Sequence, residues 1–246
     1  SSDLAILVGL TGTDDFRTNV GWVNADGEGI EVMVRLYAAS GQLLSERTFH
    51  ERPLGQTQFE LFGRMGVTPV ADAYAAVIAD GRVQPYASVV AGGSNDPIYV
   101  NAMTGVDLAT EVLVPAVARV GGAFGTVWTS DVWILNAGWH TTAVTAELWL
   151  QDQANTTPQQ VPIADALAPG EQVRIEDVIG GVFALDDTQG ALVIRTETPV
   201  LVTSRTFNTT MDGTFGQFIA GRSFASLGGV GETTLLTGVV HGDDFR

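Results

Sequence analysis

The chain has 246 residues, 45% of them hydrophobic, which is enough for two domains of ordinary size with cores of their own. Its 28 acidic and 12 basic residues leave a net charge of -16, so nucleic acids and anionic lipid surfaces are poor partners. It contains no cysteine, which excludes disulfides, thiolate metal sites and cysteine nucleophiles.

The sequence also lacks the apolar runs of a membrane protein. No stretch approaches the roughly 18 apolar residues that span a bilayer as a helix, so we expect no membrane insertion. No charged and hydrophobic leader precedes the first predicted strand, and we expect any signal peptide to have been removed. We therefore interpret the chain as secreted or displayed on the cell surface.

The first predicted elements are strands. Residues 4–10 and 16–24 form the first two, and in the third, residues 30–37, apolar and polar side chains alternate from Ile30 to Leu36. Alternation with a period of two predicts a strand with one buried face.

The same order of elements recurs further along the chain. Residues 16–24 align with residues 128–136, an offset of 112, and residues 30–37 align with residues 144–151. Each copy continues with a turn, a strand and a short helical corner. Two more strands follow, at residues 74–83 and 86–90 in the first copy and at residues 190–196 and 200–207 in the second, and a final strand closes each copy. This recurrence predicts two tandem repeats, at residues 1–106 and 107–228, followed by the opening strand of a third repeat at residues 229–246.

The spacing of the elements predicts the fold class. Strands recur every 8 to 12 residues or so, Gly, Asn, Asp and Pro separate them, and no long stretch has a helical period. We therefore expect an all-β protein made of two tandem antiparallel, immunoglobulin-like β-sandwiches.

The C-terminal segment repeats the start of the chain. Residues 232–240 follow the pattern of residues 3–10, and residues 243–246 reproduce residues 14–17 identically. An unpaired strand would leave backbone groups and apolar side chains in water, so we expect it to pair with its own second repeat or with a neighbouring molecule. A cut within a longer array of repeats is the alternative. The expected assembly residues are Leu235, Leu236, Val239 and Val240 at this end, and Leu4, Ile6 and Val8 at the other.

Three segments carry a family resemblance: residues 128–136, the Pro169-Gly170 turn before residues 175–178, and residues 216–219. In these segments the chain resembles immunoglobulin-like repeat modules of bacterial secreted and cell-surface proteins. The resemblance implies stalks, adhesive or assembly domains, or appendages of enzymes. The first repeat departs from it, because Gly21 stands where the second repeat has Trp133.

The sequence offers no constellation for catalysis or for metal binding. His50, His140 and His241 have no partner at metal-ligand spacing, and Ser94 lacks the surroundings of a nucleophile. Asn24, Asp26 and Glu28 alternate within a predicted loop, and their side-chain oxygens are of the kind that calcium binds. The EF-hand spacing is absent, and a solvated turn explains the pattern better. We expect no catalytic residue, no metal and no cofactor.

Two tryptophans of the second repeat are candidate ligand contacts. Four of the five tryptophans lie between residues 128 and 149, and exposed aromatic rings stack on sugars or on other proteins. Trp133 and Trp149 are the candidates.

These observations lead to two functional hypotheses. The first is a non-enzymatic extracellular structural protein, whose copies or neighbouring repeats join head to tail through β-strand contacts into a filament or stalk. The second is an adhesion module that binds carbohydrate or protein through exposed tryptophans of the second repeat.

Overall fold

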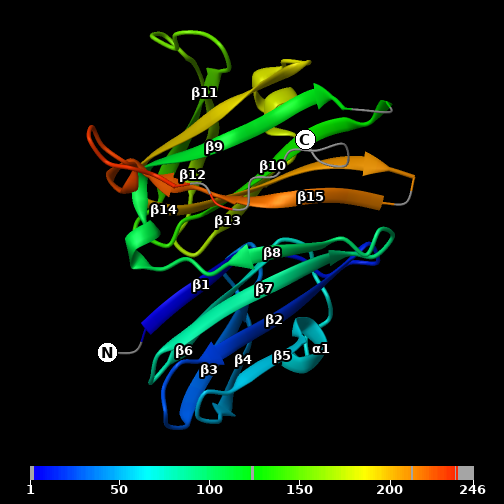
Figure 1. Cartoon of the computed structure of the whole chain (residues 1–246), viewed down its shortest axis with the longest axis vertical. Coiled ribbons are helices and arrows are strands. Elements are labelled where there is room, and N and C mark those ends of the chain that lie inside the picture. Colours follow the sequence, from blue (N-terminus) through cyan, green and yellow to red (C-terminus); the bar gives the residue numbers. More distant parts are fainter. Residues whose placement is uncertain (1–2, 123–124, 212, 236, 238–246) are drawn as a thin grey trace.

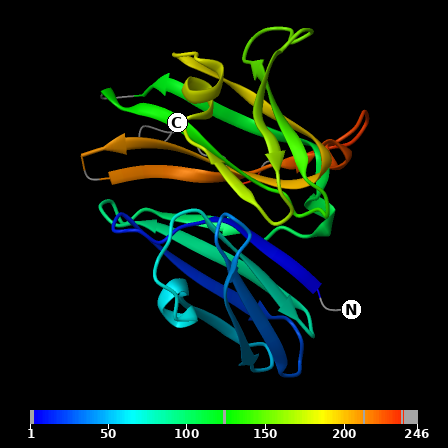
Figure 2. The same cartoon turned by 180° about the vertical axis from the view of Figure 1, so that it is seen from behind.

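The computed structural model describes residues 3–122, 125–211, 213–235 and 237. Its regular structure is almost entirely antiparallel β-sheet, arranged in two halves stacked along the long axis (Figures 1 and 2). The prediction of an all-β fold of antiparallel sandwiches is confirmed. We call the half from β1 to β8 repeat 1 and the half from β9 to β16 repeat 2.

Repeat 1 is a sandwich of two four-stranded sheets, and a short helix, α1 (Leu61–Met65), follows its fifth strand. Its buried core includes the side chain of Trp22, which is fully buried. The first sheet has the order β1 (Asp3–Leu10), β6 (Ala73–Ala79), β3 (Ile30–Tyr37), β4 (Leu43–Glu51), and the second has the order β5 (Gln56–Glu60), β2 (Phe16–Asn24), β7 (Val83–Ala91), β8 (Pro97–Asn101).

Repeat 2 contains the same two layers with the same neighbours. Its long strand β14 (Thr188–Thr210) runs through both layers, so the sheets are continuous. One layer pairs β12 (Gln159–Leu167), β11 (Thr142–Leu150), β14, β9 (Ala109–Gly121) and β16 (Arg222–Ser223), and the other pairs β13 (Gln172–Ile175), β10 (Val127–Leu135), β14 and β15 (Gly213–Ala220). The helical turns are η1 (Gly105–Asp107), η3 (Val178–Val182) and η4 (Phe224–Ser226).

The strand β14 takes the place of both β6 and β7, which the sequence pattern predicts as two strands in each repeat. In repeat 1 the chain turns at residues 80–82, where the backbone N–H and the side chain of Arg82 bond to Asp26. In repeat 2 the backbone N–H of Glu197 donates to the hydroxyl of Thr142 at 2.9 Å, and this contact holds the corner extended.

The strand neighbours follow an immunoglobulin pattern. The order β1-β6-β3 in one layer and β2-β7-β8 in the other is that of strands B-E-D and C-F-G in an immunoglobulin sandwich. Strands β4 and β5 extend the two layers beyond this core.

Each repeat has a fully buried asparagine at the end of its second strand, and the two are bonded in the same way: Asn24 is the last residue of β2, and Asn136 directly follows β10. Asn24 donates to the carbonyls of Glu28 and Arg52, and its Oδ1 accepts from the backbone of Asp26 at 2.8 Å. In repeat 2, Asn136 donates to two carbonyls and accepts from the backbone of Gly138 at 3.0 Å. The repeated asparagine therefore satisfies buried backbone groups at the corresponding place in each repeat.

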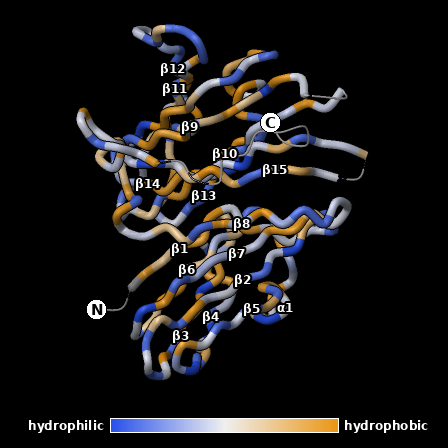
Figure 3. Tube along the Cα trace, in the orientation of Figure 1, coloured by the Kyte–Doolittle hydropathy of each residue, from blue (hydrophilic) through white to orange (hydrophobic). Residues whose placement is uncertain are grey.

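The hydropathy of the chain follows this architecture, because apolar segments lie along the strands within each half and at the boundary between them (Figure 3). The C-terminal segment is different. Residues 232–235 and 237 lie in no strand, and Leu235 is 81% exposed. The expectation that the third opening strand pairs within its own chain is wrong for these residues. Leu236, Val239 and Val240 lie outside the described residues.

Candidate functional site at the boundary between the repeats

One face of repeat 2 covers the open side of repeat 1. In the sheet β13-β10-β14-β15, the odd-numbered residues of β10 and β14 and the even-numbered residues of β13 and β15 point away from its own core. These residues meet the gap between β1 and β8, where the sandwich of repeat 1 is open. Strands β8 and β15 lie side by side there in both views (Figures 1 and 2). We call the face of repeat 2 the docking face and the open side of repeat 1 the seam.

An apolar cluster of its own joins the two surfaces. Trp133 and Leu135 on β10 and Leu201 on β14 pack against Val8 on β1 and Tyr74 on β6. These five side chains are all at most 8% exposed. Burial of this kind holds the repeats as one unit, because separating them would expose the whole cluster to water.

Single hydrogen bonds fix the register of the two repeats. Gln172 donates from its backbone to the carbonyl of Ala39 at 2.7 Å and from its side chain to the carbonyl of Asp72 at 2.8 Å. The hydroxyl of Tyr74 donates to the carbonyl of Gly170 at 2.8 Å, and burial raises the pKa of Tyr74 to about 12. Among the described strands, no hydrogen-bonded ladder crosses this boundary.

A second set of bonds ties the far end of the seam to β15. The hydroxyl of Ser94 donates to the carbonyl of Thr214 at 2.7 Å, and the backbone of Gly216 donates to Asp96 at 2.9 Å. The turn between β7 and β8 is thereby held against repeat 2, so both ends of the boundary are fixed.

Between these two anchors lies a cavity of about 260 Å³. Both repeats contribute to its walls, which are mainly apolar, and two arginines of repeat 2 reach it. Its apolar lining includes Val8, Phe16, Val89, Ile98, Val100, Trp133 and Phe218, and its polar lining includes Thr11, Thr13, Asp15, Arg174, Thr203 and Arg205.

Arg205 is a buried cation, with only 9% of its surface exposed. Its guanidinium lies 5.2 Å from the ring of Phe16 and 4.7 Å from the ring of Phe207, and it donates to the hydroxyl of Thr214 at 2.6 Å. In the described part of the chain no carboxylate lies within ion-pair distance of it. Burial lowers the pKa of Arg205 to about 10, which still leaves it charged at neutral pH.

Arg174 stands in the opposite situation, because it is paired. It donates to Asp131 at 2.7 Å, and its guanidinium lies 5.3 Å from the ring of Trp133. Asp131 is 4% exposed and also accepts from the backbone of Asp177 at 2.9 Å. Burial raises the pKa of the Asp131 carboxyl above its usual value in spite of this arginine.

Three buried polar atoms of residues that line the cavity lack a hydrogen-bond partner in the described part of the chain. They are the Nε atoms of Arg174 and Arg205 and the hydroxyl of Thr203, which is 1% exposed. Buried polar groups in native proteins are normally bonded, so three such atoms around one cavity need an explanation. Hydrogen-bond donors beside an apolar cavity are suited to binding a small molecule that has both a polar group and an apolar body.

Repeat 2 has a seam of its own, which the described residues leave open. A pocket of about 440 Å³ lies there. Register fixes the correspondence, because Trp149 pairs with Ala191 as Tyr37 pairs with Tyr74, and all four lie at the edge of a seam. Residues 30–37 therefore correspond to residues 142–149, and the expected alignment with residues 144–151 is wrong by two residues. The pocket residues Pro115, Ala116, Trp149, Gln151 and Ala191 occupy the positions that Val8, Gly9, Tyr37, Ala39 and Tyr74 hold in the contact between the repeats.

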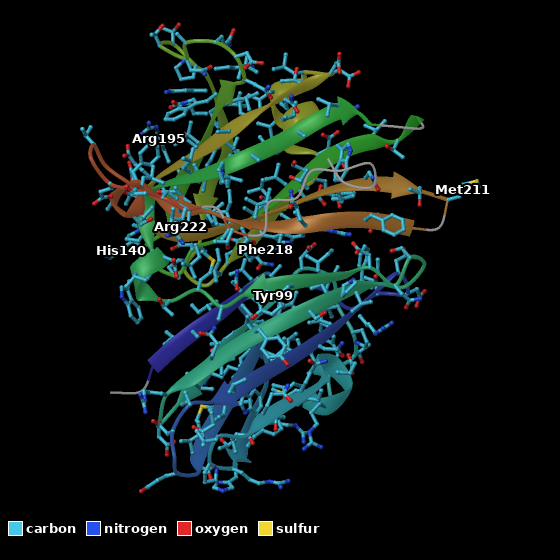
Figure 4. All side chains as sticks on the ribbon, in the orientation of Figure 1. Tyr99, His140, Arg195, Met211, Phe218 and Arg222 are labelled. Atoms are coloured by element: carbon cyan, nitrogen blue, oxygen red, sulfur yellow. The ribbon has the colours of Figure 1, made fainter. Side chains whose placement is uncertain are left out.

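Repeat 1 likewise has an uncovered counterpart of the docking face. Where Leu135, Gly170 and Phe218 make contact in repeat 2, repeat 1 has apolar side chains in solvent: Val23 is 39% exposed, Leu54 72% and Tyr99 52%. Tyr99 stacks on Tyr86 at a ring distance of 5.6 Å. Figure 4 shows Phe218 at the boundary and Tyr99 on the free face of repeat 1.

The structure separates the two candidate tryptophans. Trp133 is 8% exposed, so the expected exposure of this residue is wrong; repeat 1 covers the strand face that carries it. Trp149 is partly buried and meets Phe224 edge to face at 6.0 Å beside the open seam. The tryptophan with the largest described exposure in repeat 2 is Trp139, at 89%.

Two of the three expected assembly residues of β1, Ile6 and Val8, lie at the boundary. Val8 is buried in the contact with repeat 2, and Leu4 is 49% exposed near the start of the strand. Ile6 forms a two-way backbone bridge with Met103, at 2.7 and 2.8 Å. The free edge of β1 is therefore partly occupied by the segment that leads into repeat 2.

The histidines take no part in this region. His50 bonds to Glu31 at 3.0 Å, His140 lies exposed (Figure 4), and His241 is outside the described residues. Over the ranges that the structure describes, no group of three or more His, Cys, Asp or Glu side chains is arranged to hold a metal ion. Over the same ranges, no helix is long and apolar enough to cross a membrane.

Sequence reasoning missed Arg174, Thr203 and Arg205. One signal was present, since residues 200–207 form an apolar strand interrupted by an arginine, and a charge in a buried strand needs a partner.

Comparison with known proteins adds little to this geometry. No family model matches the chain, and no curated protein matches it. One solved structure, titled "BspA_C_mut", aligns over 89% of this chain and 90% of its own length, with 10% identity and a TM-score of 0.18. A likeness at this level carries no argument about fold or function.

Proposed function

We propose that the protein is a non-enzymatic structural subunit of the cell exterior, and that its copies assemble head to tail by the contact that already joins its two repeats. The observation that carries the proposal is the open pocket of about 440 Å³ on repeat 2, which occupies the place of the covered seam on repeat 1. A second copy of this chain is the occupant that fits it, because repeat 1 has the corresponding face free.

The two free surfaces are complementary in kind. The pocket on repeat 2 is bordered by Trp149, Pro115 and Ile219, and the free face of repeat 1 presents Tyr99 and Val23. Small residues also match across the proposed joint: Ala116 stands in place of Gly9, and Gly21 stands in place of the Trp133 that packs on Gly9. The methyl group of Ala116 thus replaces part of the side-chain volume that is lost where Gly21 stands in place of Trp133.

The two surfaces belong to different repeats, so the contact is heterologous. Each copy would offer one face and one seam, and a heterologous contact that does not close into a ring grows into an open chain. This polarity supports a filament or stalk.

Sedimentation velocity over a range of protein concentrations tests the proposal. We expect the wild type to form a concentration-dependent series of oligomers, and Tyr99→Asp, or Ala116→Asp at the open seam, to shift it to monomer. Leu43→Asp is the matched control, because Leu43 is 48% exposed on β4, away from both surfaces, and should assemble normally.

Mixing the two variants tests polarity. Tyr99→Asp keeps a working seam and Ala116→Asp keeps a working face, so the mixture should form dimers and nothing longer. A wild type that stays monomeric at all concentrations, or assembly that survives both substitutions in one chain, would overturn the proposal.

The third opening strand has a place in this proposal. At an offset of 229, Leu235 corresponds to Ile6 of β1, and its side chain is 81% exposed. We expect the segment from residue 232 to pair as a strand at the joint between copies, which would bury Leu235. Leu235→Asp should then weaken assembly while leaving the melting temperature of the monomer unchanged.

A further inference from the structure

We propose that the cavity between the repeats binds a small organic carboxylate with an apolar body. This goes beyond the assembly contact, because it concerns the joint inside one chain. The cavity combines a mainly apolar wall from repeat 1, whose polar residues are Thr11, Thr13 and Asp15, with cationic and hydroxyl side chains from repeat 2.

The donors define the charged end of the ligand. Arg174, Arg205 and Thr203 line the cavity, and the Nε atoms of both arginines and the hydroxyl of Thr203 have no hydrogen-bond partner among the described residues. Thr203 and Arg205 are 1% and 9% exposed, so bulk water does not reach them freely. A carboxylate accepts several hydrogen bonds at once, and bonds between arginine and a carboxylate are among the strongest in proteins.

The charges select an anion over a neutral ligand. Arg174 already has Asp131 as a partner at 2.7 Å. Arg205 has two aromatic rings and the Thr214 hydroxyl, and among the described residues the carboxylates that attract it, Asp131 and Asp96, lie beyond ion-pair distance. A buried cation without a counter-ion is costly, and a bound carboxylate would supply the missing charge.

The walls define the other end of the ligand. Val8, Val89, Ile98 and Val100 of repeat 1 and Phe218 of repeat 2 give the cavity an apolar lining. Its volume of about 260 Å³ is below the roughly 300–1,000 Å³ of sites for drug-sized ligands. The ligand class is therefore a small monocarboxylate of the size of benzoate or octanoate.

Only the joint inside the chain has these donors. By register, repeat 1 carries Gln58 where repeat 2 has Arg174, and Ser88 where repeat 2 has Arg205. A joint between two copies would bring the face of repeat 1 to the seam and so would lack both arginines. Ligand binding should therefore be independent of assembly, with one site per chain.

Isothermal titration calorimetry with sodium octanoate and sodium benzoate tests the proposal, with 1-octanol as the neutral probe. We expect saturable binding of at least one carboxylate at one site per chain, at least about tenfold tighter than 1-octanol. Arg205→Met should weaken carboxylate binding by about tenfold or more, and Thr203→Val should weaken it by a smaller factor. Arg222→Met is the control, because Arg222 is exposed on β16 (Figure 4), and it should bind as the wild type does.

The melting temperature of each variant without ligand shows whether it is folded, and Arg205→Lys provides a second variant that keeps the charge but loses the guanidinium geometry. Three results would overturn the proposal. The first is that neither carboxylate binds at concentrations up to about 10 mM. The second is that 1-octanol binds as tightly as octanoate, and the third is that a folded Arg205→Met protein binds carboxylate as the wild type does.

Discussion

The indole N–H of Trp133 donates to Asp72 at 3.0 Å across the boundary between the repeats. The same ring lies over the backbone of Gly9, where an added Cβ would come within 3.2 Å of it. One side chain of repeat 2 therefore contacts two segments of repeat 1, the strand β1 and the loop before β6. Because Trp133 is 8% exposed, these contacts are made out of water, where they contribute most.

Trp133→Ala should therefore uncouple the repeats. Loss of the ring removes the largest side chain of the boundary cluster, and we expect the free energy of unfolding to fall by about 3–5 kcal/mol. Denaturation in urea should also change from one transition to two, as each repeat unfolds by itself. Trp139→Ala is the control, because Trp139 is 89% exposed, and it should change stability by no more than about 0.5 kcal/mol. Equal effects of the two substitutions would contradict the prediction.

Gly41 should be sensitive to the addition of a single methyl group. Its φ is +81°, a left-handed conformation that side chains disfavour, and a Cβ there would lie 2.8 Å from the carbonyl oxygen of Gly170 in the other repeat. We expect Gly41→Ala to cost about 1–3 kcal/mol. Gly27→Ala, where a Cβ meets nothing within 4 Å, should cost much less, as thermal denaturation of both variants will show.

The two cavity arginines should respond oppositely to loss of charge. Arg205 has no carboxylate partner, so Arg205→Met removes a buried charge and should leave the ligand-free protein as stable as the wild type or up to about 2 kcal/mol more stable. Arg174→Met leaves Asp131 buried without its cation and should cost about 3–5 kcal/mol. Urea denaturation without ligand distinguishes the two, and an unstable Arg205→Met protein would show that this charge stabilises the fold by itself.

The strands and their repetition could be predicted because they depend on local patterns. Ile30, Val32, Val34 and Leu36 alternate with polar or partly buried neighbours in the sequence, and all four are at most 5% exposed in β3. The recurrence of Asn24 as Asn136 also has a local cause, since each asparagine bonds to backbone groups around its own turn.

The position of the site could not be predicted, because it depends on how the repeats meet. On β10 both Val132 and Trp133 are buried, the first in the core of repeat 2 and the second against repeat 1. A strand that is covered on both faces does not alternate between apolar and polar side chains, and exposure is inferred from that alternation. For this reason the sequence places Trp133 at a surface. Arg205 contacts the ring of Phe16, 189 residues earlier in the chain, only because the two repeats pack against each other.

Glu147 should give the stability of the protein a dependence on acid pH. It is 4% exposed on β11, and burial alone would raise the pKa of its carboxyl. Hydrogen bonds from the Trp149 indole at 2.5 Å, Arg195 at 3.0 Å and Gln160 at 3.0 Å outweigh burial and lower the pKa below 4.5. A carboxyl whose pKa is lower in the folded state stabilises the fold above the unfolded value and loses that contribution as the pH falls through the folded value.

We therefore expect Glu147→Gln to be less stable than the wild type by about 1–3 kcal/mol at pH 7, because a charge-assisted network loses its anion. The difference should shrink as the pH falls below 4.5, since the wild-type carboxyl then becomes neutral as well. Glu28→Gln, at an exposed carboxylate, should follow the wild-type curve throughout. Urea denaturation between pH 2.5 and 7 provides the comparison, and a difference between Glu147→Gln and wild type that stays constant across this range would show that the network contributes by packing and not by charge.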